Sequence, residues 1–130
     1  MRALVTAGAT LAVREVPEPT TTETEALVGV HAASTNRGEV RLVTLRPDDW
    51  HGGQDVAGVI ARAAADGSGP PVGTRVVAWV DQAGWAEYVP APTDRIVPLP
   101  DNVATVDAAT LPVAGVTALR ALRRGGLLRP

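Results

Sequence analysis

The chain contains no cysteine. That absence excludes disulfide bonds, zinc sites built from thiolates and a thiol nucleophile, and it leaves the redox compartment open. Lysine is also absent, so all 12 basic residues are arginine. We attribute this to a compositional bias of the genome, because no short stretch before the C-terminus concentrates the arginines.

Long apolar runs and a strong net charge are missing as well. No run approaches the ~18 residues that a membrane-spanning helix needs, and the first residues, MRALVTAGATLAVREV, reach charge too soon for a signal peptide. The net charge of −2 provides no basic surface for nucleic acid. The 130 residues are 45% hydrophobic, as in an ordinary folded domain. We therefore expect one cytoplasmic domain that binds neither nucleic acid nor membrane.

Short apolar segments separated by turn-forming residues fill the first part of the chain. Strands are predicted over residues 2–5, 11–16, 26–33, 55–63, 75–80 and 85–89. Residues 7–10 are expected to form a hairpin turn, and ADGSGPPVG (65–73) a loop. The prolines between 90 and 100 predict an extended edge, since proline cannot donate to a β-ladder. Many short strands at close spacing favour an antiparallel barrel or sandwich.

Helices are predicted at two places. The segment NRGEVRLV (36–43) suits a short helix with Asn36 as its N-cap. Near the C-terminus, a short helix is expected at about 105–110, followed by a longer one. Its start and stop signals are Thr105 and Thr110 as N-caps, Pro112 in a first turn, Arg123 and Arg124 in the last turn, and Gly125-Gly126 at the end.

Four stretches carry a family resemblance. They are ALVGVHAASTNRGEVRL, GGQDVAGVIARAAADGSGPPVGTRVVAW, GWAEYVPAPTDRIVPLPDNV and AATLPVAGVTALRAL, and they cover nearly the whole chain. In this order and spacing they resemble the N-terminal GroES-like domain of medium-chain dehydrogenases/reductases, in the zinc-free, quinone oxidoreductase-like branch. The resemblance implies a mainly β domain over residues 1–130, a GroES-like, partly open antiparallel β-barrel with C-terminal helices. It also implies that residues from about 103 onward, ending in GGLLRP, lead toward a Rossmann cofactor domain.

The resemblance also bears on metal and cofactor. Asn36 and Gln54 stand where zinc-dependent relatives place a Cys and a His ligand, and neutral amides are poor ligands for Zn²⁺. The cysteine-rich lobe that holds a structural zinc in those relatives is absent too. The resemblance therefore implies a metal-free reductase that uses NADPH to transfer hydride to a small-molecule quinone or polarised alkene.

Two residues are assigned to the cofactor by the resemblance, Asn36 and Thr117. The Asn36 amide would hydrogen-bond the nicotinamide ribose, its carboxamide or a substrate oxygen, and we place it among the catalytic residues. Its local alternative is the helix N-cap. The Thr117 hydroxyl would reach the nicotinamide end, and its alternative is a core helix position where threonine bonds the preceding turn.

Asp55 and Arg41 are placed on the substrate side. Asp55 matches an acidic position beside the active-site floor, where a structural hydrogen bond is the favoured interpretation. Arg41 stands where quinone reductases often carry a tyrosine. Glu39 is expected on a solvated helix face, paired with Arg37 or Arg41.

Trp50 and His51 are expected on a mobile loop that overhangs the cleft. Trp50 is then the tryptophan that faces a ligand, whereas Trp79 and Trp85 are interpreted as barrel packing. His51 is a candidate general acid, and its alternative is an ordinary loop histidine.

The dinucleotide fingerprint is the last absence. No Gly-x-Gly-x-x-Gly turn joins a strand to a helix, so micromolar binding of NAD(P)H by this chain alone is not expected. The chain is then a catalytic domain that is inactive without its Rossmann domain, or a stand-alone barrel that binds a small molecule or protein. An enoyl-reductase portion of a larger synthase is a third interpretation. An exposed apolar helix face would favour a homodimer.

Overall fold

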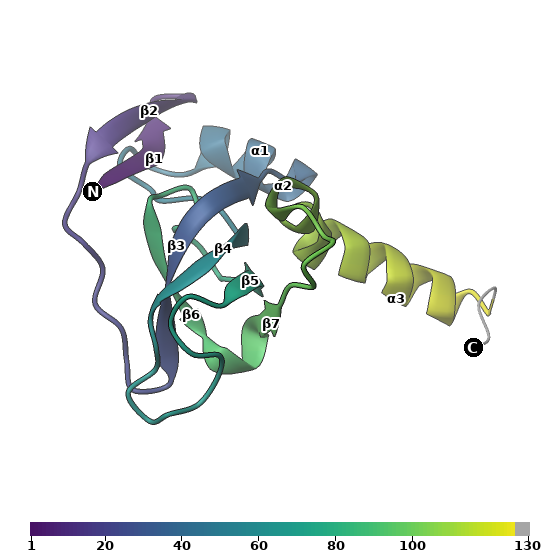
Figure 1. Cartoon of the computed structure of the whole chain (residues 1–130). Helices are drawn as coiled ribbons and strands as arrows, with labels where there is room; N and C mark the ends of the chain where they lie inside the picture. Colours follow the sequence, from purple (N-terminus) through teal and green to yellow (C-terminus); the bar gives the residue numbers. More distant parts are fainter. Residues whose placement is uncertain (127–130) are drawn as a thin grey trace.

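The computed structural model describes residues 1–126. Its strands are β1 (Arg2–Ala7), β2 (Thr10–Glu15), β3 (Glu25–Ser34), β4 (Asp55–Arg62), β5 (Arg75–Trp79), β6 (Tyr88–Pro92) and β7 (Ile96–Pro98). Its helical elements are α1 (Arg37–Leu45), the 3₁₀ turn η1 (Thr93–Arg95), α2 (Thr105–Ala108), the π-helical turn η2 (Leu111–Gly115) and α3 (Val116–Arg124). Figure 1 shows the strands gathered into one curled body from which α3 projects.

All strand pairs are antiparallel. β1 and β2 form a hairpin, and the other five strands form a sheet in the order β6-β3-β4-β5-β7. Because β6 and β7 are the two edges of this curled sheet, the barrel stays partly open. The predicted mainly β, partly open antiparallel barrel is therefore confirmed.

The two edge strands carry the prolines. Pro90 and Pro92 lie in β6, and Pro98 lies in β7, so their missing N–H groups do not interrupt the ladder at its centre. The predicted edge is confirmed, but the strand expected at 85–89 lies three residues later. Its register is set by pairing with β3, where Val89 faces Val28. Trp85 precedes β6, and its N–H donates to the Gly52 carbonyl at 3.1 Å.

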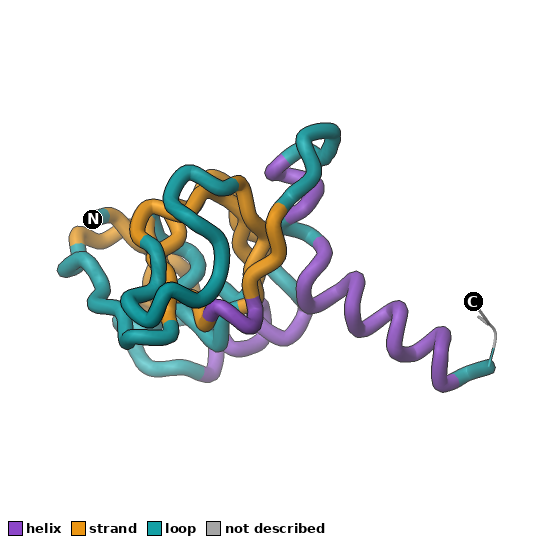
Figure 2. Tube along the Cα trace, turned by 60° about the horizontal axis from the view of Figure 1, so that its bottom comes forward, coloured by secondary structure: helices purple, strands orange, loops and turns teal. Residues whose placement is uncertain are grey.

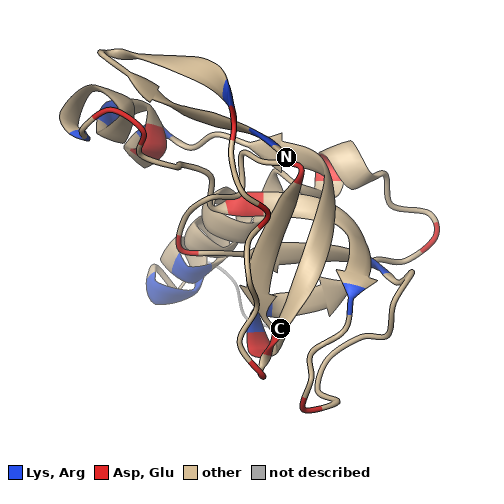
Figure 3. Ribbon diagram, turned by 90° about the vertical axis from the view of Figure 1, so that its left-hand side faces the viewer, with Lys and Arg blue, Asp and Glu red and all other residues tan. Residues whose placement is uncertain are grey.

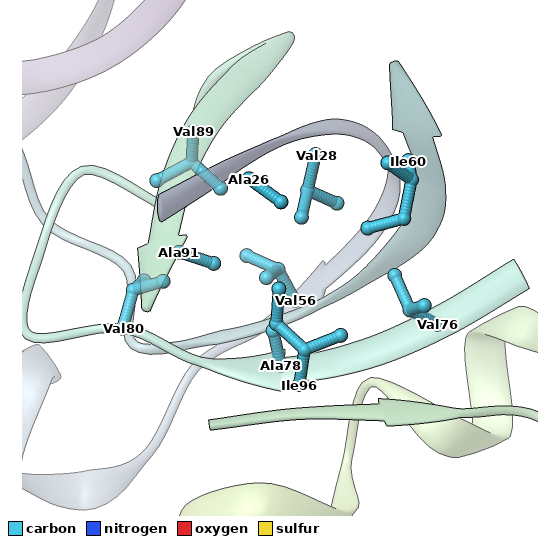
Figure 4. Packing of buried hydrophobic residues seen from close by; sticks show 10 residues of the cluster. All are labelled: Ala26, Val28, Val56, Ile60, Val76, Ala78, Val80, Val89, Ala91 and Ile96. Atoms are coloured by element: carbon cyan, nitrogen blue, oxygen red, sulfur yellow. The ribbon is translucent and has the colours of Figure 1, made fainter. Parts of the chain in front are cut away.

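The core consists of small apolar side chains. Figure 4 shows them converging inside the curl of the sheet: Ala26, Val28, Val56, Ile60, Val76, Ala78, Val80, Val89, Ala91 and Ile96. A second cluster joins Ala57 of β4 to Ala108 and Ala109 at the end of α2. Alanines at this contact let the backbones approach closely, which fixes the start of the C-terminal helical segment against the sheet.

The C-terminal helical segment begins differently from its prediction. Thr105 is the first residue of α2, where Ala104 is the N-cap, and neither Ala104 nor Thr110 makes a side-chain capping bond. The Thr110 hydroxyl donates instead to the Asp107 carbonyl at 2.7 Å. The predicted cap at Thr105 is thus wrong, because Thr105 is already the first residue of α2. Thr110 does stand at the N-cap position of η2, as predicted, but its side chain makes no capping bond.

The end of the helical segment agrees with its prediction. Arg123 and Arg124 lie in the last turn of α3, Gly125 is the C-cap, and Gly126 adopts φ 70°, a conformation that glycine reaches without strain. Figure 2 shows η2 and α3 as one continuous helical segment that leaves the barrel. The rest of the expected lead, residues 127–130, lies outside the described residues.

Within residues 1–126, no helix has the length and apolarity required to cross a membrane.

Candidate functional site

A cavity of about 500 Å³ lies between the β5–β7 side of the barrel and the η2–α3 segment. It is lined by Gln54, Val77, Ala78, Trp79, Asp94, Arg95, Val97, Leu111, Pro112, Val113, Val116, Thr117 and Arg120. Most of these side chains are apolar, and a few polar groups are set among them. This combination is typical of small-molecule sites.

Asn36 connects α1 to this cavity. Its Oδ1 accepts the Glu39 N–H at 3.0 Å, while a Glu39 carboxyl oxygen accepts the Asn36 N–H at 3.0 Å. This reciprocal capping box starts α1. The Asn36 Nδ2 also donates to Gln54 Oε1 at 3.0 Å. The predicted N-cap is confirmed, and the same side chain orients an amide on the cavity wall.

Glu39 is a correction to the sequence analysis. Its side chain was predicted on a solvated face with Arg37 or Arg41, yet the residue is 1% exposed. The capping box turns the carboxyl back under the start of α1, where Oε1 has no hydrogen-bond partner among the described residues. Burial raises the pKa of Glu39, and the negative charge of Asp55 raises it further. The hydrogen bond from the Asn36 N–H acts in the opposite direction, because it favours the ionised carboxylate.

Asp55 ties the helical segment to the barrel. It begins β4, is buried, and accepts the Val113 N–H at 2.7 Å and the Ser34 hydroxyl at 3.3 Å. The Val113 N–H is one of the groups that a helix start leaves without an intrahelical partner. Burial raises the pKa of Asp55, and these two hydrogen bonds oppose the rise. The structural interpretation of Asp55 agrees with these contacts.

Thr117 is exposed on α3 and lines the cavity, so it does not occupy a core helix position. It shares a helix face with Val113, Val116 and Arg120, which follow a spacing of three and four residues. The structure thus gathers Gln54 and Thr117 on one cavity, with Asn36 and Asp55 bound to its walls.

Three predicted residues, unlike Asn36 and Asp55, neither line the cavity nor hydrogen-bond a residue that lines it. Arg41 lies exposed on α1, and Trp50 packs edge-to-face on Trp85 with ring centroids 6.4 Å apart. His51 is not on a free overhanging loop, because its backbone forms an antiparallel bridge with Val5. Assignment of Arg41, Trp50 and His51 to the substrate or to catalysis stays a prediction.

Trp79 was overlooked as a site residue. Interpreted from sequence as barrel packing, it is 40% exposed at the end of β5, and the Arg95 guanidinium lies 4.4 Å from its ring centroid. The alternation of β5 contained the signal, since Val76 and Ala78 point inward and Trp79 has the opposite phase.

The described residues of the site suit part of a nicotinamide dinucleotide better than a metal ion. Within residues 1–126, no cluster of three or more His, Asp or Glu side chains is arranged to hold a metal ion. For the nicotinamide end of a dinucleotide, the cavity offers an apolar wall, the Gln54 amide and the Thr117 hydroxyl, which fit a carboxamide-bearing ring. The described chain offers no comparable site for the pyrophosphate, because none of its helices begins at a glycine-rich turn.

Substitution of Asn36 should separate its two roles, the N-cap of α1 and the hydrogen bond to Gln54. Asn36→Ala is expected to lower the free energy of unfolding by about 1–2 kcal/mol, since it removes the cap and the bond to Gln54. Asn36→Ser restores an N-cap acceptor but cannot reach Gln54, so it should lose less than half as much. Urea denaturation measures both. Equal losses in the two variants would contradict the capping role.

The family comparison agrees with this geometry. The alcohol dehydrogenase GroES-like domain matches residues 22–101. A chloroplast envelope quinone oxidoreductase homolog of Arabidopsis thaliana is 32% identical over 118 residues, covering 83% of this chain and 36% of its own. A trans-enoyl reductase of Aspergillus terreus is 31% identical over 110 residues, covering 64% of this chain and 36% of its own. The chain therefore spans about a third of the length of these relatives.

A solved structure gives the same result. The quinone oxidoreductase of Thermus thermophilus, described alone and in complex with NADPH, is 30% identical and superposes with a TM-score of 0.82. The match covers 100% of this chain and 42% of that protein. The chain therefore belongs to the alcohol dehydrogenase GroES-like domain family, within the medium-chain dehydrogenases/reductases and beside the quinone oxidoreductases.

Proposed function

We propose that the chain is the catalytic domain of an NADPH-dependent, zinc-independent oxidoreductase that reduces a quinone or enone by hydride transfer. The observation that carries the proposal is the Asn36–Gln54 amide pair on a cavity that Thr117 also lines. The printed functions of the relatives, quinone oxidoreductase and trans-enoyl reductase, support the same reaction class.

A nicotinamide held at this cavity would supply the hydride. The chain supplies orientation and polarity around it. Because Asn36 donates to Gln54 Oε1, the Gln54 NH₂ group is left to donate toward a substrate carbonyl. As hydride reaches a quinone or enone, negative charge develops on that oxygen, and a fixed donor stabilises it. The Thr117 hydroxyl would hold the carboxamide end of the cofactor.

The partner of this domain would be a Rossmann cofactor domain. The η2–α3 segment presents a row of apolar side chains that are more than 40% exposed: Leu111, Val116, Leu119 and Leu122. An exposed row of this kind marks a surface that another domain or another copy of the chain covers. We propose that a cofactor domain covers it, and that a homodimer is the alternative cover when that domain is missing.

The experiment fuses this chain to the cofactor domain of the Thermus thermophilus quinone oxidoreductase. The fusion should oxidise NADPH only when a quinone or enone is added, and the chain alone should not. Loss of nicotinamide absorbance reports the reaction. A folded, NADPH-binding fusion that reduces no member of a quinone and enone panel would refute the proposed reaction. Sub-micromolar NADPH binding by the chain alone would refute the need for the second domain.

Gln54 provides a matched test within that fusion. Gln54→Leu removes the donor and should lower kcat/KM about tenfold. This is less than the loss of about 10²–10³ found for donors in closed sites, because the cavity is open to solvent. Gln82→Leu makes the same replacement at an exposed position that does not line the cavity and should leave the rate unchanged. Similar losses in both variants would remove Gln54 from the mechanism.

A further inference from the structure

One wall of the cavity has features that hydride transfer does not require. Trp79 lies there with the Arg95 guanidinium 4.4 Å from its ring centroid, and Arg95 is held by Asp81 at 2.8 Å. These contacts fix an indole ring that remains 40% exposed. An electron-rich indole presents a flat surface on which an electron-poor ring stacks favourably.

The opposite wall carries an arginine that has no acidic side chain beside it in the described part of the chain. Arg120 extends from α3 on the face of Val113, Val116 and Thr117, and it lines the cavity. No acidic side chain of residues 1–126 lies within salt-bridge distance of it. In Figure 3, the acidic residues are distributed over the barrel and its loops, and α3, VTALRALRR, has none.

The charges around the cavity can be compared wall by wall. The η1 wall contributes Asp94 and Arg95, and Asp81 further balances Arg95. The α3 wall contributes Arg120 alone. The η1 wall therefore has one more acidic than basic side chain, and the positive charge that remains for a ligand lies on α3, as Arg120, across the cavity from the wall that carries Trp79. Arginine binds carboxylate and sulfonate groups through its planar, forked donors.

We infer that this cavity binds a planar, electron-poor ring that carries an anionic group, with Trp79 stacked on the ring and Arg120 paired with the anion. The inference rests on the proposed function in treating this ligand as the hydride acceptor. It narrows the hydride acceptor from any quinone or enone to one that carries an anionic group. Binding itself needs no cofactor, so it can be measured on the chain alone.

The test uses the whole chain with two probes, naphthoquinone sulfonate and uncharged naphthoquinone. Quinones add covalently to thiols and amines, but this chain has no cysteine and no lysine. Its N-terminal amine, which donates to the Val16 carbonyl at 2.9 Å, does not line the cavity. Calorimetric titration at the cavity therefore reports reversible binding. The sulfonate should bind about three- to fivefold more tightly than the parent compound, the range expected for one partly solvated ion pair. The preference should shrink as salt is added.

Two arginine variants make a matched pair. Arg120→Gln should abolish the preference for the sulfonate and leave the affinity for naphthoquinone unchanged. Arg123→Gln removes the same charge from the same helix at a position that does not line the cavity, so the preference should persist. Trp79→Leu should weaken both probes about threefold or more, because it removes the stacking surface. Circular dichroism and the unfolding midpoint verify that each variant folds.

Several results would overturn the inference. They are equal affinity for the two probes, no binding of either up to its solubility, or an equal loss of preference in Arg120→Gln and Arg123→Gln. Each of these leaves the hydride-transfer proposal standing if the fusion protein reduces uncharged naphthoquinone. Conversely, if the chain prefers the sulfonate as expected but the fusion protein is inactive, the proposed reaction is refuted and the inferred class of ligand still holds.

Discussion

Gly58→Ala is expected to lower the free energy of unfolding by about 3 kcal/mol, a large share of the total of about 5–15 kcal/mol that is typical of a folded domain. A Cβ at this position would overlap the Gly29 carbonyl oxygen and would lie 2.9 Å from the Gly29 carbonyl carbon. It would also lie 3.1 Å from the His31 backbone nitrogen. All three atoms belong to the main chain of β3, so no side chain can rotate to relieve the contact.

The close approach has a structural origin. Between Val30 and Ala32 the register of β3 against β4 shifts, which leaves His31 as an extra residue opposite Gly58. Such a bulge brings one strand toward the other and increases the local twist. Only glycine leaves room for it, so Gly58→Ala would have to separate the two central strands of the sheet.

Gly29→Ala is the matched control on the facing strand. Its Cβ would meet Tyr88 Cε1 at 3.6 Å and the Val59 oxygen at 3.7 Å, which is ordinary van der Waals contact. Its effect should stay within about 1 kcal/mol. Chemical denaturation of both variants makes the comparison. Equal effects of the two substitutions would show that β3 and β4 adjust more easily than this geometry implies.

Much of the barrel could be predicted because its signals are local. The apolar runs of β3 and β4, the turn residues between strands and the edge prolines each depend on a few neighbouring residues. The Asn36 cap is local in the same way, since its partner Glu39 is three residues away. The start of β6 was misplaced because pairing with β3, a long-range contact, decides it.

The candidate site was predicted less completely, since it depends on contacts between distant segments. Burial of Glu39 arises where α1 meets the segment before β4, and the position of His51 arises from pairing with Val5. Trp79 and Arg120 share a cavity although about forty residues separate them in the sequence. The alternation of β5 contained the signal that Trp79 faces outward, but no local pattern could show that α3 lies opposite.

Stability is expected to fall as the pH rises above the ordinary carboxyl range, and Glu39→Gln should remove part of that fall. Burial raises the pKa of Glu39 above its ordinary 4.5 and that of Asp55 above its ordinary 3.8. The folded state therefore holds more protons than the unfolded state between each ordinary value and the raised one. Stability then decreases with pH through that window, by at most about 1.4 kcal/mol per pH unit for each group.

Two surface carboxyl groups affect the stability of the chain at lower pH. Hydrogen bonds from Arg2 lower the pKa of Glu87, and Ser68 lowers that of Asp66. A lowered folded pKa adds stability that is lost as the pH falls below the ordinary value. Acidification thus weakens these surface contacts, whereas a rising pH weakens the buried pair. The two effects lie on opposite sides of the ordinary carboxyl pKa and can be separated in one series of urea curves.

Glu39→Gln preserves the size of the side chain and an oxygen that can accept the Asn36 N–H, and it removes the ionisable group. The difference in unfolding free energy between this variant and the unmodified chain should therefore move in favour of the variant as the pH rises. Glu18→Gln removes a carboxylate from an exposed loop and should leave the slope in place. If Glu39→Gln and Glu18→Gln follow the same pH curve, the buried carboxyl does not titrate as its surroundings require. The capping box alone would then account for its presence beside Asn36.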